Sequence, residues 1–87
     1  KYAVSYQGVP IRLTPNEFKL LHLLGSRAGQ TYTREQLLDA LHGAASSLDR
    51  SVDSHIKNLR KKLERASGET LIETVYGVGY RLLEPKP

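Results

Sequence analysis

The segment from residue 48 to residue 66 limits the fold more than any other part of this 87-residue chain. Its apolar side chains recur at helical spacing, and the opposite side of the same helix is polar. The apolar stripe consists of Val52, Ile56, Leu59 and Leu63. A helix of this length, about 28 Å at the standard rise, can bury that stripe only against other elements, so the rest of the chain must supply a core. Gly68 suits the left-handed position after a helix and predicts where it ends.

The outer face of this helix is basic. Six side chains within about 100° of one another include no acid: Arg50, Ser54, Lys57, Asn58, Lys61 and Arg65. Residues 48–66 carry six basic and three acidic groups, against seven and six elsewhere, so most of the net charge of +4 lies here. A helix fits the major groove of B-DNA, where short polar side chains approach the bases and long basic ones reach phosphates. Such a face is often only a solvated surface, but a solvated face usually mixes signs.

The acidic groups at the start of this helix have a separate role. Asp49 and Asp53 lie in its first turns, where a negative charge favours the helix dipole. Asp53 also precedes Lys57 by four residues, the favourable order for an ion pair within a helix.

The N-terminal part of the chain predicts a β-hairpin. Residues 2–6 and 9–13 are rich in strand-forming side chains, and Gln7-Gly8 between them is a turn signal. Pro10 indicates that the second strand lies at a sheet edge.

Two further helices begin at capping boxes. Thr14 with Glu17 begins a helix that we expect to end near Ala28, before Gly29. Thr33 with Gln36 repeats the spacing and begins a shorter helix that Gly43 ends. These helices bear the leucines that face the stripe of the long helix.

The C-terminal part predicts a second hairpin. Residues 71–75 and 80–83 are strand-like, the tip between them carries Gly77 and Gly79, and Thr31-Tyr32 is a short strand. The element order is strand, strand, helix, short strand, helix, helix, hairpin. The fold class is therefore α+β, a winged helix-turn-helix with N-terminal antiparallel strands, three helices and a C-terminal β-hairpin wing. We expect one domain over residues 1–87.

The wing can lie on a minor groove or on the DNA backbone. It offers Thr74, Tyr76 and Arg81 for this contact. The glycines at its tip lack the third glycine and the following helix of a phosphate-binding loop, so we predict no nucleotide site.

Catalytic and metal chemistry find no support. The chain has no cysteine, and no two of His22, His42 and His55 stand three or four residues apart, so we predict no metal ligand and no cofactor. Asp53, Ser54 and His55 are neighbours on one helix and diverge by about 100° each, so they cannot form a hydrolase triad. The chain has no apolar run long enough for a membrane span and no signal-peptide pattern, so we expect a cytoplasmic protein.

Four motifs together resemble the C-terminal DNA-binding domain of OmpR/PhoB-type response regulators, the output half of bacterial two-component systems. They occur in the family's order over nearly the whole chain: residues 13–21 (LTPNEFKLL), 33–38 (TREQLL), 50–63 (RSVDSHIKNLRKKL) and 72–82 (IETVYGVGYRL).

The resemblance implies that residues 48–66 are the recognition helix. The positions that match the family's usual DNA contacts are Arg50, His55, Lys57, Asn58, Arg60, Thr74 and Tyr76. Arg60 lies near the core stripe, so a structural role such as pairing with an acid is an alternative. The resemblance also implies double-stranded promoter DNA as partner, dimers on tandem half-sites, a preceding receiver domain, and contact between the loop 43–47 and RNA polymerase.

The chain differs from what the family implies at four places. The family's sheet has further N-terminal strands, so we expect that part to be trimmed here. His42 stands where many members have Trp, and its packing role is not carried over. Tyr76 stands where the wing often has a basic residue, so Arg81 is the alternative source of positive charge. The loop 43–47 is nearly featureless, which weakens the polymerase assignment.

Two other kinds of function compete with DNA binding. A winged helix whose basic face docks an acidic protein would not bind duplex DNA at moderate salt. An enzyme or small-ligand domain would need a deep pocket that we do not expect. A membrane-surface helix is disfavoured because the apolar stripe is needed for the core.

Overall fold

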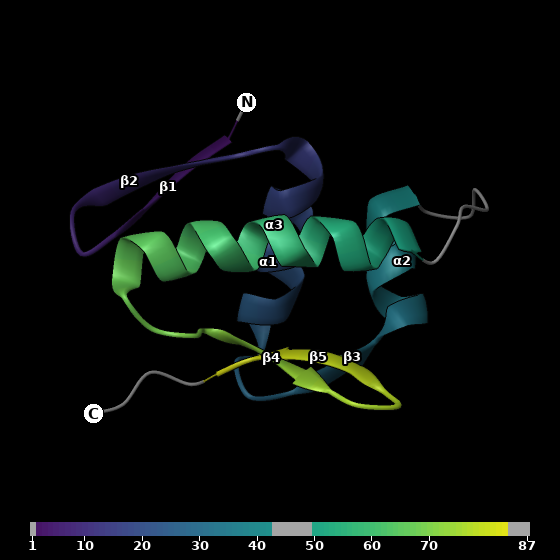
Figure 1. Cartoon of the computed structure of the whole chain (residues 1–87). Helices are drawn as coiled ribbons and strands as arrows, with labels where there is room; N and C mark the ends of the chain where they lie inside the picture. Colours follow the sequence, from purple (N-terminus) through teal and green to yellow (C-terminus); the bar gives the residue numbers. More distant parts are fainter. Residues whose placement is uncertain (1, 43–49, 84–87) are drawn as a thin grey trace.

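The computed structural model of the protein describes residues 2–42 and 50–83. Its elements in chain order are β1 (Tyr2–Tyr6), β2 (Val9–Leu13), α1 (Pro15–Ser26), β3 (Thr31–Thr33), α2 (Arg34–His42), α3 (Arg50–Ser67), β4 (Ile72–Val75) and β5 (Gly79–Leu82). Figure 1 shows α3 crossing α1, with β1 and β2 beyond one side of α3 and the other three strands beyond its opposite side. The predicted fold class and order of elements are confirmed. No helix of the described residues is long and apolar enough to cross a membrane.

The five strands form two antiparallel sheets. β1 and β2 make a two-stranded ribbon whose turn, Gln7-Gly8, has φ values of 49° and 85°. Two positive φ values match the turn type that suits the twist of a tight hairpin. Pro10 pairs with Ser5 in this ribbon, so it lies in a strand with one neighbour, as its ring requires.

The second sheet has the order β3-β5-β4, and one glycine permits its close pairing. Gly79 is opposite both Thr33 and Val75. A Cβ at Gly79 would lie 1.9 Å from the carbonyl oxygen of Tyr32, so any side chain there would push β3 and β5 apart. The predicted hairpin strands are confirmed with ends shifted by one residue.

Both predicted capping boxes are present. Thr14 Oγ1 accepts from the Glu17 amide at 3.1 Å, and Glu17 Oε1 accepts from the Thr14 amide at 2.9 Å. Thr33 and Gln36 form the same two bonds at the start of α2, at 3.1 and 2.9 Å. Each box satisfies amides that a helix start would otherwise leave without partners.

The end of α1 differs from the prediction. The helix ends at Ser26, not near Ala28. The reason is tertiary: the chain turns early, so that the amide of Gly29, at φ 93°, donates to the carbonyl of Leu82 in β5 at 2.7 Å. α2 ends at His42, and Gly43 lies outside the described residues.

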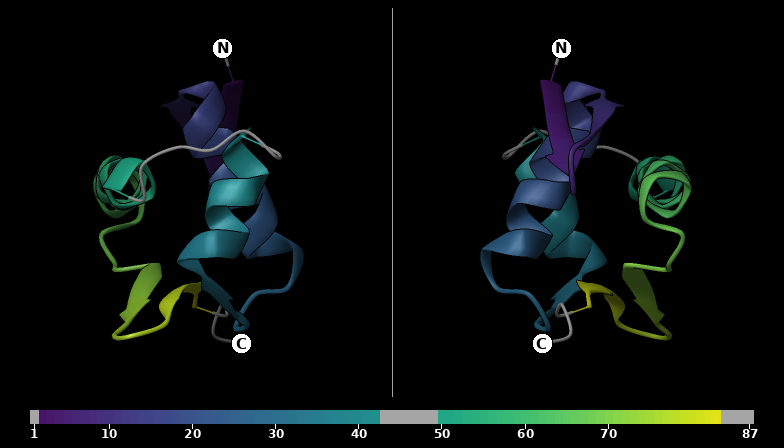
Figure 2. Two further views of the ribbon diagram at one scale, coloured as in Figure 1. Left: turned by 90° about the vertical axis from the view of Figure 1, so that its right-hand side faces the viewer. Right: turned by 90° about the vertical axis from the view of Figure 1, so that its left-hand side faces the viewer.

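The long helix buries its predicted stripe. Val52, Ile56, Leu59 and Leu63 are all buried, against α1, α2 and β2. The helix extends to Ser67, one residue beyond the predicted end, and Gly68 follows it at φ 78°. Residues 48 and 49 lie outside the described residues. Figure 2 shows α3 end-on at one side of the molecule, with β4 on that same side.

Candidate nucleic-acid interface

The outer face of α3 is exposed and free of intramolecular partners. In the structure, the outer face of α3 consists of five exposed residues: Ser54, Lys57, Asn58, Lys61 and Arg65. None of them makes a hydrogen bond or an ion pair with another side chain of the described residues. Arg50 begins α3 at the same helical angle, but its side chain lies outside the described part. Three unpaired cations and two short polar groups therefore point away from the core.

The flank of α3 toward α1 is tied down. His55 is half-buried, and its Nε2 lies 3.1 Å from Nδ2 of Asn16 at the start of α1. Seven residues on, Lys62 Nζ donates to Oε1 of Glu17 at 2.6 Å. Because Glu17 is only 2% exposed, this bond satisfies a buried carboxylate as well as holding α3 on α1. The structure thus gives His55 an internal partner beside its predicted DNA role.

The flank of α3 toward the hairpin holds a carboxylate shared by two donors. Asp53 Oδ1 accepts from the Tyr80 hydroxyl at 2.6 Å and from Arg34 Nε at 3.0 Å. The carboxylate therefore faces α2 and the hairpin rather than Lys57, which corrects the ion pair suggested by their spacing. The Tyr80 hydroxyl, and then Arg34, lower the pKa of Asp53. Burial, and then the neighbouring Asp53, raise the pKa of Tyr80.

Arg60 bridges α3 to the hairpin. Its Nη2 donates to Thr74 Oγ1 at 2.8 Å, and its guanidinium carbon lies 5.8 Å from the centre of the Tyr80 ring. The Nε of Arg60 is buried and has no partner among the described residues. Arg60 therefore has structural contacts, as the alternative interpretation of the sequence suggests. Its partners, however, are the Thr74 hydroxyl and the Tyr80 ring instead of an acid.

The tip of the hairpin is the other exposed part of this side. Tyr76 is 89% exposed, and Gly77 beside it has a φ of 80°. Arg81 pairs with Glu73 across the two strands. Of the three predicted wing contacts, Tyr76 is the one without a polar partner in the described residues, because Thr74 is bound by Arg60 and Arg81 by Glu73.

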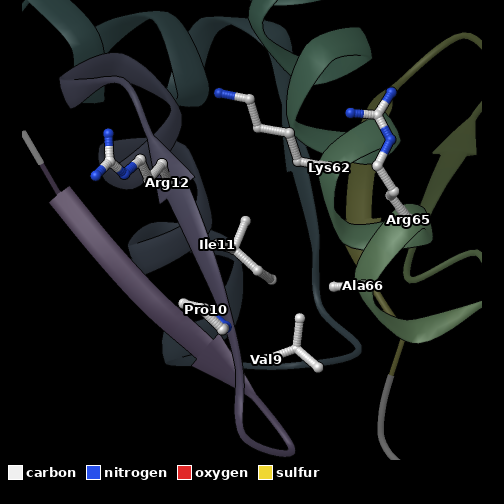
Figure 3. A pocket seen from close by; sticks show the side chains of 7 residues that line it. All are labelled: Val9, Pro10, Ile11, Arg12, Lys62, Arg65 and Ala66. Atoms are coloured by element: carbon white, nitrogen blue, oxygen red, sulfur yellow. The ribbon is translucent and has the colours of Figure 1, made fainter.

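A shallow groove extends the basic surface from α3 to β2. It is lined by Val9, Pro10, Ile11, Arg12, Lys62, Arg65 and Ala66 (Figure 3). Cationic groups from both elements stand over an apolar floor, and no carboxylate, histidine or hydroxyl of residues 2–42 and 50–83 lines it. A second, larger groove between β1 and the start of β4 is mostly apolar, and among the described residues Glu69 is the one carboxylate that lines it. Neither groove brings together groups for acid–base chemistry.

Sequence reasoning missed Arg34 and Tyr80. The sequence pattern places Arg34 at the start of a helix and Tyr80 in a strand, and it indicates no contact between them. The alternation of apolar and charged residues in β5 indicates that Tyr80 faces inward. A buried tyrosine hydroxyl needs a hydrogen-bond partner, so this pattern is the signal that could have pointed to Tyr80.

The comparisons with known proteins agree on one family. The family described as "Transcriptional regulatory protein, C terminal" matches residues 8–82. The transcriptional regulatory protein BaeR of Escherichia coli O6:H1 is 47% identical over 83 residues, which cover 93% of this chain and 35% of BaeR. This chain spans about a third of the length of the curated relatives it matches.

Two of the similar solved structures contain DNA. The DNA-binding domain of the response regulator AdeR, in complex with an intercistronic region, has a TM-score of 0.86 and 33% identity over 98% of this chain and 88% of that one. The Klebsiella pneumoniae RstA DNA-binding domain, in complex with the RstA box, has a TM-score of 0.79 and 37% identity over 93% of this chain and 82% of that one.

A basic helix face beside a hairpin, on a core of three helices, defines a winged-helix DNA-binding domain. The chain belongs to the transcriptional regulatory protein C-terminal family, the DNA-binding output domains of OmpR/PhoB-type response regulators. This family regulates transcription and is not enzymatic, so the prediction of a non-enzymatic domain is confirmed.

Proposed function

We propose that this domain binds double-stranded promoter DNA with α3 in the major groove and residues 76–81 on the minor groove or the backbone. The observation that carries the proposal is the outer face of α3, where three cations and two short polar groups are exposed and have no partner among the residues that the structure describes. Internal partners would have to be broken before DNA could bind, whereas free groups only exchange water and counterions. The DNA complexes of AdeR and RstA support the same conclusion.

The outer face divides into reading and anchoring groups by position along α3, with the reading groups in the middle and the anchoring groups before and after them. Ser54, Lys57 and Asn58 are assigned to base edges, because a hydroxyl, an ammonium or an amide can match the donor and acceptor pattern of the major groove. Lys61 and Arg65, together with Arg50, are assigned to phosphates, which supply most of the affinity and little selectivity.

Four other predicted contacts would bind DNA while already holding an internal partner. These are His55, Arg60, Thr74 and Arg81. A phosphate contact by any of them shares or exchanges an existing bond, so we assign them a smaller contribution to affinity. Tyr76 is free, and its exposed ring is assigned to the sugar–phosphate wall of the minor groove.

We also propose how this domain belongs to a longer regulator. We assign residues 1–87 to a single output domain of a two-component response regulator, preceded by a receiver domain and by further strands, in the cytoplasm. Binding as a dimer on tandem half-sites and contact with RNA polymerase through the loop 43–47 follow from the family. That loop lies outside the described residues.

A salt titration of DNA binding tests the proposal. Fluorescence anisotropy of a mixed-sequence duplex is measured from low to physiological salt. If about four phosphates are neutralised, the logarithm of the association constant falls with the logarithm of salt at a slope near −3.6. Lys61→Ala is expected to reduce that slope by about 0.9.

Lys19→Ala is the matched control, because Lys19 is an exposed lysine of α1. It is expected to leave the slope unchanged. No binding at low salt would reject DNA as the ligand and favour an acidic protein partner for the same face.

A further inference from the structure

Five side chains connect the start of α2, α3 and the hairpin. We call them the hairpin cluster: Arg34, Asp53, Arg60, Thr74 and Tyr80. The closest backbone packing of α3 is with α1, α2 and β2, so α3 and the hairpin meet through side chains, and the hairpin cluster supplies the polar contacts between them. Figure 1 shows that space between the ribbons of α3 and of β4 and β5.

The hairpin cluster attaches α3 to the hairpin at two points. The first is the bond from the Tyr80 hydroxyl of β5 to Asp53, at 2.6 Å, and the second is the bond from Arg60 to Thr74 of β4, at 2.8 Å. Asp53 and Arg60 are seven residues apart, which is about 10 Å along a helix. Two attachments at that spacing, together with the pairing of β5 with β3, hold the hairpin in one orientation against α3.

The Tyr80 ring lies between the two attachments. It is 6% exposed, and the guanidinium carbons of Arg34 and Arg60 lie 5.9 and 5.8 Å from its centre. Both distances suit a cation–π contact. The ring therefore orders two arginines, and its hydroxyl adds a charge-assisted bond to Asp53.

This cluster contributes more to geometry than to stability. The side chains of Arg34 and Asp53 are each 43% exposed, and ion pairs of that exposure stabilise a fold only slightly. The bonds join α3 to both strands of the hairpin, so they bear on where the hairpin stands relative to the outer face of α3.

We infer that Tyr80 is a positioning residue for DNA binding, whose hydroxyl holds the hairpin at the angle that lets Tyr76 touch DNA while α3 lies in the major groove. The inference rests on the proposed function. Tyr80 itself is buried and touches no DNA, so its effect on affinity passes through Tyr76.

A double-mutant cycle on DNA affinity tests this. Tyr80→Phe keeps the ring and removes the hydroxyl, and we expect it to weaken binding about threefold, which is within the range of one hydrogen bond and no more than the loss of Tyr76 itself. Tyr76→Ala is expected to weaken binding about threefold in the otherwise unchanged domain, and less than about 1.5-fold in the Tyr80→Phe background. Thermal unfolding of each variant is followed in parallel, because a merely structural role would change stability and leave the two effects additive.

The matched control is Tyr32→Phe. Tyr32 pairs directly with Tyr80 in the sheet, is also buried, and shares its hydroxyl with Ser26 instead of α3. It is expected to leave affinity unchanged.

The outcomes separate this inference from the proposed function. If the unchanged domain binds no duplex, the proposed function is wrong and the inference falls with it. If the domain binds but the two losses are additive, or if Tyr80→Phe or Tyr76→Ala alone costs nothing, the inference is overturned while DNA binding stands. Should Tyr80→Phe fail to fold, Asp53→Ala removes the acceptor of the same bond, and additivity of that variant with Tyr76→Ala overturns the inference equally.

Discussion

The outer face of α3 and the flank of the same helix toward the hairpin differ in what their polar groups touch. On the flank, Asp53 and Arg60 are each bound to side chains of other elements. On the outer face, Lys57 and Asn58 are bound to nothing within the described residues. The two sets alternate along one helix, so composition does not separate them, and only their angle around the helix axis does.

This difference shows how one helix can be both a structural element and a ligand-binding one. Polar groups that stabilise the fold already form hydrogen bonds with internal partners. Those that remain available carry charge without a counterion, which is the condition for binding a polyanion by counterion release. Substitutions on the two sides of α3 should therefore separate stability from binding.

The largest expected effect compares two adjacent residues of α3. Leu59 is fully buried and Asn58 is exposed. Leu59→Ala should lower the free energy of unfolding by about 3 kcal/mol, because it leaves a cavity in the core. Asn58→Ala should change it by less than about 0.5 kcal/mol. Urea denaturation measures both, and a large loss for Asn58→Ala would show that the outer face is not free.

The next effect concerns sequence preference within the outer face. Asn58→Ala should shrink the difference in affinity between a selected duplex and a scrambled one, because a bidentate base contact contributes about 1–3 kcal/mol of discrimination. Lys61→Ala should weaken binding to both duplexes alike, since a phosphate contact carries no sequence information. Competition anisotropy measures the two ratios. Equal losses on both duplexes for Asn58→Ala would count against its reading role.

A smaller effect is expected on the flank at acid pH. The pKa of Asp53 is lowered in the folded state, so its contribution to stability is present above the ordinary carboxyl pKa. That contribution is lost as the pH falls below about 4 and through the lowered value. Asp53→Asn should flatten this part of the profile of unfolding midpoint against pH. Glu35→Gln, at an exposed acid of α2, is the control and should not.

The smallest effect is expected at alkaline pH. The pKa of Tyr80 is raised, so its contribution is complete below the ordinary tyrosine pKa and is lost as the pH rises above about 10. Tyr80→Phe should remove that loss from the thermal unfolding profile. An unchanged alkaline limb in the variant would mean that Tyr80 does not cause it.

Local signals predicted the elements well because their causes are local. The Thr14–Glu17 box and Gly68 mark helix ends through bonds and angles within a few residues. The end of α1 is less local: the chain leaves the helix after Ser26, and the Gly29 amide bonds to Leu82 in a strand that is distant in the sequence. The family motifs identified the DNA-binding class, since they cover nearly the whole chain.

The partners of the flank could not be predicted, for the same physical reason. Asp53 meets Arg34 and Tyr80 from 19 and 27 residues away. Helical periodicity gives the angle of Asp53 around α3 but not which element lies opposite. Helical periodicity does predict the outer face, because the angle of a residue around α3 is enough to show that its side chain faces solvent and no other element has to be known.

The central claim, that the outer face of α3 meets DNA, is tested most directly by an NMR titration of the domain with a duplex at moderate salt. The predicted result is that the largest shifts occur at residues 54, 57, 58 and 61 and at Tyr76, with those of Lys19 and its neighbours in α1 unchanged. Shifts concentrated on β1 and β2, with the signals of α3 unmoved, would contradict it.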